Sequence, residues 1–507
     1  MEADRVDYAL PLDEGVLEGV CNRGREGLWG PLNIPDDPDE CIYTPYEHIH
    51  AQYYSEETRP DLQSLYKRHG KRKTVLRGVD RLKLIQSVIA ARLNEGGCHL
   101  DIPKLKKNKC ILALFPFHDK EELYELQLNW LTWSLPNSQP FDEIKDYMGE
   151  KIGLYFVWLG HYTVFLFWGA VIGFLAWINV ALKDNDPDAE VIPYFSVFIA
   201  LWVTVYLESW KRKEAETALR WGMTGFEEQE QPRPQFKGEE RPSPITGQTE
   251  LYYPTLTKYK HMTYTQSIIT VFIGIVAICI VAIFFLKAFL LDSPNDKNIA
   301  IGGTALGGII ASLLNAIQIQ IFNAIYGWAS IKLNDFENHR TDTEYEDNLI
   351  VKTFLFQFVN SYASLFYIAF LKADNEGCVD SCMIELQTAL GTIFLTRLAV
   401  GNLMEVGMPL LNQKKAEAAE MEGVTDKEMS AAEREFILSE YDVMLGPFAD
   451  YSEMAIQFGY ATMFVAAFPL ALLMSFINNF IEIRVDAWKI SQQSRRPEVM
   501  IAIILLT

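Results

Sequence analysis

Long apolar runs separated by charged segments dominate the chain after residue 150. The runs lie at about 152–182, 191–207, 265–291, 300–329, 349–371 and 383–411, and a further mostly apolar stretch covers 450–489. Several of them reach the roughly 18–20 residues that a helix needs to cross the hydrocarbon of a bilayer. Residues 1–150, in contrast, mix polar and apolar positions. The pattern predicts a mainly α, polytopic helical membrane domain over 151–507, behind a small N-terminal domain over 1–150.

The N-terminal domain carries weaker signals. The apolar run Cys110–Phe117 predicts a buried strand, and the segment DKEELYELQLNWL after it is typical of a helix, as is Leu84–Leu93. These signals favour a small α/β domain. The acidic start of the chain, MEADRVDYALPLDEG, lacks the basic and then apolar build of a secretory signal peptide. We therefore expect this domain to be cytosolic.

Charged residues at the ends of the runs indicate which side of the membrane each end faces. The run 191–207 leads into WKRKEAE, and such basic segments remain on the cytosolic side. Cys378 and Cys382 lie in a short loop between the spans 349–371 and 383–411. We expect a disulfide between them if that loop faces an oxidising compartment. The protein is then an integral, multi-pass membrane protein, of the plasma membrane or of an endomembrane such as the endoplasmic reticulum.

The stretch 450–489 carries acids at both ends of an apolar run. Asp450 and Glu453 are three residues apart and Glu482 and Asp486 are four apart, spacings that place each pair on one helix face. In one straight helix Glu453 and Glu482 would lie roughly 43 Å apart, at about 1.5 Å per residue. Pro469 lies about midway between the pairs, and a proline breaks or kinks a helix. A hairpin that turns near Pro469 would bring all four carboxylates to a similar depth.

Four carboxylates that converge inside a membrane require a cation. Each ionised carboxylate in a spanning segment costs on the order of 2.5–3.5 kcal/mol, and close carboxylates also repel one another, so they would have to protonate or bind a metal ion. Oxygen ligands without a nearby histidine or thiol favour a hard ion, and Ca²⁺ tolerates the irregular geometry of such a site better than Mg²⁺. The alternative is that these acids lie in water at the helix ends.

The run 383–411 contributes a further acid at its predicted cytosolic end, Glu405, together with Arg397. Gly401, Gly407 and Pro409 flank the acid and permit the helix to bend, which makes them candidate gating hinges. Elsewhere, polar side chains interrupt two spans, at Asn315 and Gln318 and at Gln357 and Asn360. Such side chains either bind another helix or line a permeation path. Together with Arg397, they are the candidate groove residues.

The net charge and the absence of certain sequence motifs argue against several classes of function. The formal net charge of −21 argues against nucleic acid as a partner. The sequence contains no P-loop, nucleophile elbow, zinc motif or dinucleotide fingerprint, so we do not expect an enzyme. A cation-coupled transporter would show internal inverted repeats, which are not recognisable here. A membrane tether would need no acidic hairpin.

Together these segments resemble the anoctamin family of Ca²⁺-activated membrane proteins over residues 145–497. The matching strings are KIGLYFVWLGHYT (151–163), ESWKRKEAETALRW (208–221), RPQF (233–236), TEYEDNLIVKTFLFQFVNSYASLFYIAF (343–370), NLMEVGMP (402–409), GPFADYSEMAIQFGYATMFVAAFPLA (446–471) and NNFIEIRVDAWK (478–489).

The resemblance implies ten membrane helices, a homodimer with a groove in each subunit, and two Ca²⁺ ions per subunit. Its ligand positions fall on Glu405, Asp450, Glu453, Glu482 and Asp486. Many members carry a ligating asparagine one turn before the sixth-helix glutamate. Here that position is Gly401, and Asn402 stands beside it.

Two further helices of the family follow the segment RRP, and the last of them builds the dimer contact. About eight of the ten helices are therefore expected in this chain, with only a stub over 498–507. The homodimer is expected where the full C-terminal part is present.

Together, these signals predict a Ca²⁺-activated channel for chloride or other small anions. In this hypothesis the carboxylates repel one another when Ca²⁺ is absent, so that Glu405 moves away. Ca²⁺ binding then draws the sixth helix back. The runner-up is a Ca²⁺-activated phospholipid scramblase, or both activities, with membrane lipids as partners. Arg397 slightly favours anions, although a lone arginine can also pair with a neighbouring acid.

Overall fold

We describe the protein from a computed structural model, which places residues 9–11, 50–52 and most of the stretch 77–497. Within 77–497 the description leaves out 91–96, 101, 103–104, 106–107, 112, 132–134, 184–188, 224–232, 234, 243–248, 292–299, 302–303, 376, 379–380, 421–429 and 443–444. Residues 498–507, where we predicted a stub, lie outside the described residues.

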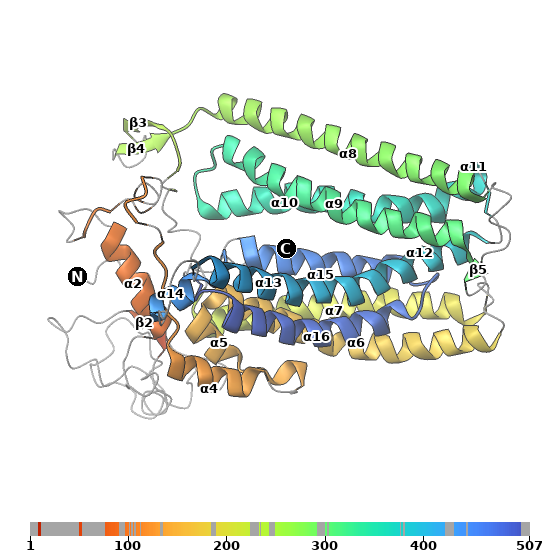
Figure 1. The fold of residues 1–507 in the computed structure, drawn as a ribbon, viewed down its shortest axis with the longest axis horizontal. Helices are drawn as coiled ribbons and strands as arrows, with labels where there is room; N and C mark the ends of the chain where they lie inside the picture. Colours follow the sequence, from red (N-terminus) through yellow and green to blue (C-terminus); the bar gives the residue numbers. More distant parts are fainter. Residues whose placement is uncertain are drawn as a thin grey trace, which may run out of the picture.

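The described part of the chain is mainly helical, and its long helices run side by side (Figure 1). Those that precede the acidic hairpin are α6 (Glu150–Leu182), α7 (Val191–Trp221), α8 (Thr255–Leu291), α9 (Leu306–Phe336), α10 (Asp342–Phe366), α12 (Cys382–Thr396) and α13 (Asn402–Glu420). Among the described residues, five helical segments are long and apolar enough to cross a membrane: α6, α7, α8, the segment 342–375 and the segment 382–418. The prediction of a polytopic helical membrane protein is confirmed.

Most helices extend beyond the apolar runs that predicted them. α6 matches its run, whereas α7 continues through WKRKEAE to Trp221 and α8 begins ten residues before residue 265. These extensions are polar or charged, which is compatible with water, and the helix satisfies its own backbone hydrogen bonds there. The start of the run 300–329 instead forms a small hairpin of β5 (Ala300–Ile301) and β6 (Thr304–Ala305).

Two of the predicted spans contain a π-helical turn. The fifth passes from α10 into η8 (Tyr367–Leu371) and then α11 (Lys372–Asn375), and the sixth passes from α12 through η9 (Arg397–Gly401) into α13. Between these spans Cys378 and Cys382 form the expected disulfide.

The acidic stretch folds as the predicted hairpin. α15 (Leu445–Met463) and α16 (Ala471–Trp488) are joined by a turn that contains Pro469. α16 packs against α6 as well as against α15, and Leu472 and Ile483 of α16 are buried in the large hydrophobic core. A π-helical turn, η10 (Lys489–Gln493), follows α16.

The N-terminal elements gather at one end of the bundle, opposite α11 and β5 (Figure 1). They comprise the strand pair β1 (Ala9–Pro11) and β2 (His50–Gln52), the helices α2 (Gly78–Ala90), α4 (Lys120–Trp130) and α5 (Phe141–Met148), and the 3₁₀ turn η5 (Pro136–Ser138). The strand pair β3 (Glu239–Pro242) and β4 (Thr249–Tyr252) and the helix α14 (Ala431–Phe436) lie at the same end.

The predicted strand Cys110–Phe117 is wrong. Its described residues form no strand, and the side chains of Leu114 and Phe117 are exposed rather than buried. Pro116 also lacks the backbone N–H that a central strand would donate. The helix predicted after this run is confirmed as α4, and the helical signal of Leu84–Leu93 is met in its described part by α2.

Close approach of backbones fixes the hairpin against α6. A Cβ atom placed on Gly173 would lie 2.6 Å from the carbonyl oxygen of Pro469, at the hairpin turn. Any side chain at this position forces the turn and α6 apart. The glycine therefore sets how closely the acidic hairpin approaches the first long helix.

We predict that Gly173→Ala destabilises the protein by about 1–3 kcal/mol, the usual cost of overpacking. The matched control is Gly274→Ala in α8, where an added Cβ meets no described atom within 4 Å. Thermal unfolding of the purified protein in detergent checks this. Equal melting temperatures for the two variants would contradict the contact.

Candidate metal centre

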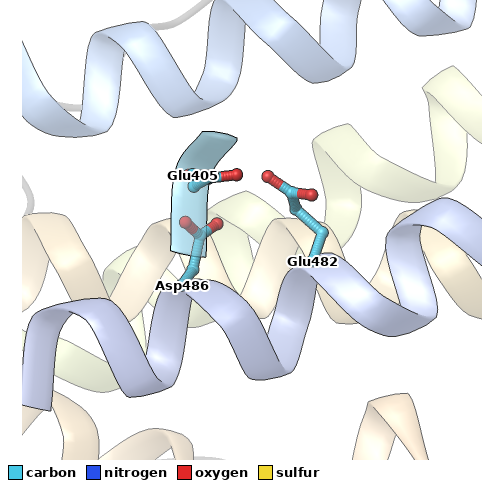
Figure 2. A group of neighbouring side chains, drawn as sticks. All are labelled: Glu405, Glu482 and Asp486. Atoms are coloured by element: carbon cyan, nitrogen blue, oxygen red, sulfur yellow. The ribbon is translucent and has the colours of Figure 1, made fainter. Parts of the chain in front are cut away.

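Three carboxylates from two helices converge inside the bundle. Glu405 comes from α13, whereas Glu482 and Asp486 lie one turn apart on α16. One carboxylate oxygen from each lies within 4.8 Å of the other two, and Figure 2 shows the three side chains pointing toward one another. Glu482 and Asp486 are buried, and Glu405 is half-buried. The structure thus unites the sixth-span acid with the second acid pair of the hairpin.

Lys489 links these three carboxylates to a fourth, that of Asp450. The Lys489 ammonium lies 2.5 Å from Oε1 of Glu405, 2.6 Å from Oδ1 of Asp486 and 3.2 Å from Oδ1 of Asp450. Asp450 belongs to α15, so the lysine connects carboxylates of three helices. An ammonium has three donors, and each of them here meets one carboxylate.

Two tyrosine hydroxyls hold the outer oxygens of the aspartates. Tyr155 of α6 donates to Oδ2 of Asp486 at 2.6 Å, and Tyr441 donates to Oδ2 of Asp450 at 3.2 Å. The inner Oδ1 of each aspartate is the atom that faces Lys489. Each of the two aspartates is therefore oriented by two donors, a tyrosine hydroxyl at Oδ2 and the Lys489 ammonium at Oδ1.

Glu453 takes a different position from the other predicted ligands. Its side chain is 46% exposed, and Oε1 lies 3.8 Å from the guanidinium of Arg397, which also donates to the Glu453 backbone oxygen. Glu453 is not part of the three-carboxylate group. Arg397 pairs with an acid here, which is the alternative that the sequence left open for it.

Amide side chains extend the polar interior beside the carboxylates. Asn402 donates to Asn478 at 2.9 Å, and Asn478 donates in turn to Gln457 at 3.0 Å. Oδ1 of Asn402 is buried and has no hydrogen-bond partner among the described residues. It is an oxygen with free lone pairs, three residues before Glu405.

This donor set fits a hard divalent cation. Its atoms are carboxylate oxygens and one unpartnered amide oxygen, which are the ligands that Ca²⁺ prefers, at distances of about 2.3–2.6 Å. Glu405, Glu482 and Asp486 are the residues that would hold such an ion directly. Asp450 and Asn402 are the nearest additional donors that the geometry offers.

The candidate groove residues on α9 and α10 bind each other. Asn315 donates to Ser364 at 3.1 Å, and Gln318 donates to Asn360 at 3.0 Å. Asn360 is buried and donates to the backbone oxygen of Ile319. These contacts favour the role of helix-to-helix hydrogen bonding. Gln357 differs, because its buried Oε1 has no partner among the described residues.

The candidate hinge residues surround an irregular part of the sixth span. Gly401 ends the π-helical turn η9, and Pro409 lies within α13. Among the described residues, an added Cβ on Gly401 or Gly407 would meet nothing within 4 Å. These two positions therefore have space beside them, unlike Gly173 of α6.

Lys489, Tyr155 and Tyr441 were not among the residues predicted from the sequence. Lys489 follows Asp486 by three residues, a spacing that places the two on one helix face and could have identified it. Tyr155 lies 331 positions from Asp486, so only the packing of α6 against α16 reveals the contact.

Comparison with known proteins shows which family this chain is similar to. Residues 144–502 match the family model described as "Anoctamin: Calcium-activated chloride channel". Human anoctamin-7 is 29% identical over 98% of this chain, human anoctamin-5 is 29% identical over 97%, and mouse anoctamin-4 is 31% identical over 84%. The chain covers 61%, 63% and 53% of the lengths of these three relatives.

We predict that Tyr155→Phe weakens Ca²⁺ binding to the purified protein by about 10-fold or more, since donors that orient a metal ligand typically contribute this much. Direct titration of bound Ca²⁺ checks it. Tyr326→Phe is the matched control, because that buried hydroxyl donates to the Lys352 backbone oxygen, away from the carboxylates. Equal affinities of the two variants would contradict the positioning role of Tyr155.

Proposed function

This chain belongs to the anoctamin family, and from that premise we propose that it is a Ca²⁺-activated channel for chloride or other small anions. The family model is that of a calcium-activated chloride channel. The chain spans about three fifths of its curated relatives, so activity, permeant species and partners are proposals for it. In this proposal the protein is a membrane transport protein and not an enzyme.

One observation carries the proposal: Glu405 of α13 meets Glu482 and Asp486 of α16 inside the membrane bundle. Three carboxylates at such close range repel strongly in a medium of low dielectric constant, and a cation relieves that repulsion. Since the acids come from two helices, the charge at the site controls how closely those helices approach. This is the physical requirement for a ligand-gated helix.

We infer that α13 moves and α16 stays, and the packing around each helix supports this inference. α16 is held by α6 and by the hairpin turn, where backbones already touch at Gly173. α13 follows the π-helical turn η9, and Leu403 and Met404 on its surface are exposed. A bound Ca²⁺ would supply the positive charge that neutralises the carboxylates. Glu405 transmits that change to α13, which bends at Gly401, Gly407 or Pro409 and opens or closes the conduction path.

We propose two Ca²⁺ ions per subunit. Two ions require roughly 12–16 oxygens, more than the ten that five carboxylates supply, so Asn402, water or backbone carbonyls would complete the shells. Asp450 lies within reach through its contact with Lys489, whereas Glu453 would have to leave Arg397 to join.

The topology supports Ca²⁺ access from the cytosol. The disulfide loop and the N-terminal elements lie at opposite ends of the bundle (Figure 1), and disulfides form in oxidising compartments. Ser494, five residues after Lys489, accepts a hydrogen bond from His118 at the N-terminal end. We therefore propose that residues 1–150 form a cytosolic domain and that the carboxylates of the membrane domain, 151–507, lie near it.

We also propose the homodimer that the family resemblance implies. Phospholipid scrambling is the second candidate activity, and the membrane in which the protein resides is either the plasma membrane or the endoplasmic reticulum.

We predict that Glu405→Gln, Glu482→Gln and Asp486→Asn each raise the Ca²⁺ concentration for half-maximal activation by about tenfold or more, because each removes one converging charge. Glu453→Gln has a smaller effect, since this side chain is half exposed and paired with Arg397. Currents from cell-free membrane patches at stepped Ca²⁺ concentrations check this.

Glu385→Gln on α12 is the control for these variants, because it removes a carboxylate that pairs with Lys372 at the other end of the bundle. Unchanged Ca²⁺ sensitivity in all three site variants would contradict the proposed site.

We further predict that proteoliposomes containing this chain release chloride when Ca²⁺ is added. Chloride electrodes and the chemical bleaching of fluorescent lipids measure anion leak and lipid flip on the same vesicles. Lipid flip with Ca²⁺ would favour the scramblase. Membrane activities that are all insensitive to Ca²⁺ would favour a tether and overturn the proposal.

A further inference from the structure

The ammonium of Lys489 contacts two of the three carboxylates that would hold a cation, Glu405 and Asp486. Its distances of 2.5 Å to Glu405 and 2.6 Å to Asp486 are close to Ca²⁺–oxygen distances of about 2.3–2.6 Å. These two residues also belong to the group of three whose oxygens converge. An ion that binds Glu405 and Asp486 together would therefore compete with the ammonium for the same oxygens.

Electrostatic repulsion makes the two occupants mutually exclusive. A divalent ion and an ammonium that share two carboxylates would be separated by only a few ångströms, where like charges repel strongly in a partly buried site. The Lys489 side chain is 17% exposed, so solvent reaches only a small part of it. Either the lysine or the metal can hold Glu405 and Asp486, but not both in this geometry.

The lysine can leave without moving its own backbone. The segment after it is anchored by Ser439, whose N–H donates to the Gln493 carbonyl at 3.1 Å, and by Arg495, whose N–H donates back to Ser439 at 2.8 Å. His118 contacts the Ser494 carbonyl as well. With the main chain fixed, displacement falls on the four-carbon stem of the side chain, which is flexible and still partly exposed.

We propose that Lys489 is a built-in competitor of Ca²⁺. In this inference, which rests on the proposed Ca²⁺ site, the ammonium bridges Glu405, Asp450 and Asp486 when Ca²⁺ is absent, and Ca²⁺ must expel it to bind. The lysine thus sets the Ca²⁺ concentration at which the site fills. It also discriminates by charge, because a monovalent ion gains no more from the carboxylates than the tethered ammonium already does.

This role changes the gating mechanism proposed from the sequence, in which Glu405 moves away when Ca²⁺ is absent. The carboxylates do not have to repel Glu405 outward when Ca²⁺ is absent, because Lys489 bridges α13, α15 and α16 in its place. What changes on binding is the position and charge of the cation between the helices.

The test is direct Ca²⁺ binding to the purified full chain, measured by radioactive Ca²⁺ at equilibrium, with Lys489→Gln and Lys489→Arg. We expect Lys489→Gln to bind Ca²⁺ at least tenfold more tightly than the unmodified chain, and Lys489→Arg, which keeps the charge, to bind no more tightly. Lys372→Gln is the matched control, since it removes a buried lysine that pairs with Glu385 and has no contact with the site among the described residues.

A second measurement tests the proposal even if Lys489→Gln is unstable without Ca²⁺. Lys489→Gln is purified with Ca²⁺ bound and mixed with chelator, and the release of Ca²⁺ is followed in time. We expect release to be several-fold slower than from the unmodified chain. Equal or faster release, or equal or weaker binding at equilibrium, would overturn the competitor role and leave Lys489 as a residue that positions the carboxylates.

The outcomes also separate this inference from the proposed function. If the unmodified chain binds Ca²⁺ and Lys489→Gln binds it no more tightly, only the inference about Lys489 fails. If neither protein binds Ca²⁺, the proposed Ca²⁺ site fails and the competitor role fails with it.

Discussion

The cost of placing several carboxylates inside a membrane bundle governs this structure. Glu405, Glu482 and Asp486 lie at close range, and Asp450 joins them through Lys489. Negative charges at such distances are relieved by protonation or by a cation among them. In this structure Lys489 supplies positive charge to the site, and a bound ion from solution would do the same. That dependence on positive charge links the chemistry of the site to the positions of the helices that carry the acids.

The scaffold divides the acids between a fixed helix and a loosely packed one. α16 is packed against α6. Gly173 of α6 has no side chain, which lets α6 approach the Pro469 carbonyl closely. Tyr155, also on α6, donates its hydroxyl to Asp486 of α16 and fixes that carboxylate. α13 carries Glu405 on a segment that follows the π-helical turn η9, and no described atom would lie within 4 Å of a Cβ added to Gly401 or Gly407. In the proposed mechanism, a change of charge at the site therefore acts on α13 rather than on α16.

Several polar residues elsewhere in the spans bond one another across helices. Gln318 and Asn360 satisfy each other across α9 and α10, as Asn315 and Ser364 do. Apolar side chains distinguish poorly between lipid and a neighbouring helix, so such hydrogen bonds help to specify which helices pair. Arg397 is likewise engaged with Glu453. A polar residue in a spanning run is thus weak evidence for a permeation path until its partners are known.

The sequence by itself determined the membrane helices and the hairpin at Pro469. It also predicted the acids from which the candidate site is drawn, and it allowed a disulfide between Cys378 and Cys382 if their loop faces an oxidising compartment. Hydrophobic run length, proline chemistry and the cost of buried charge are local or additive properties, and a sequence displays them directly. Tertiary structure decided which of the acids converge, that Glu453 faces Arg397, and that Lys489 and Tyr155 contact the carboxylates. Those facts depend on the rotation of each helix about its axis and on contacts between residues up to 331 positions apart. The prediction of a strand over Cys110–Phe117 was wrong because it also depended on tertiary contacts. An apolar run becomes a buried strand only where the fold provides a partner to cover it.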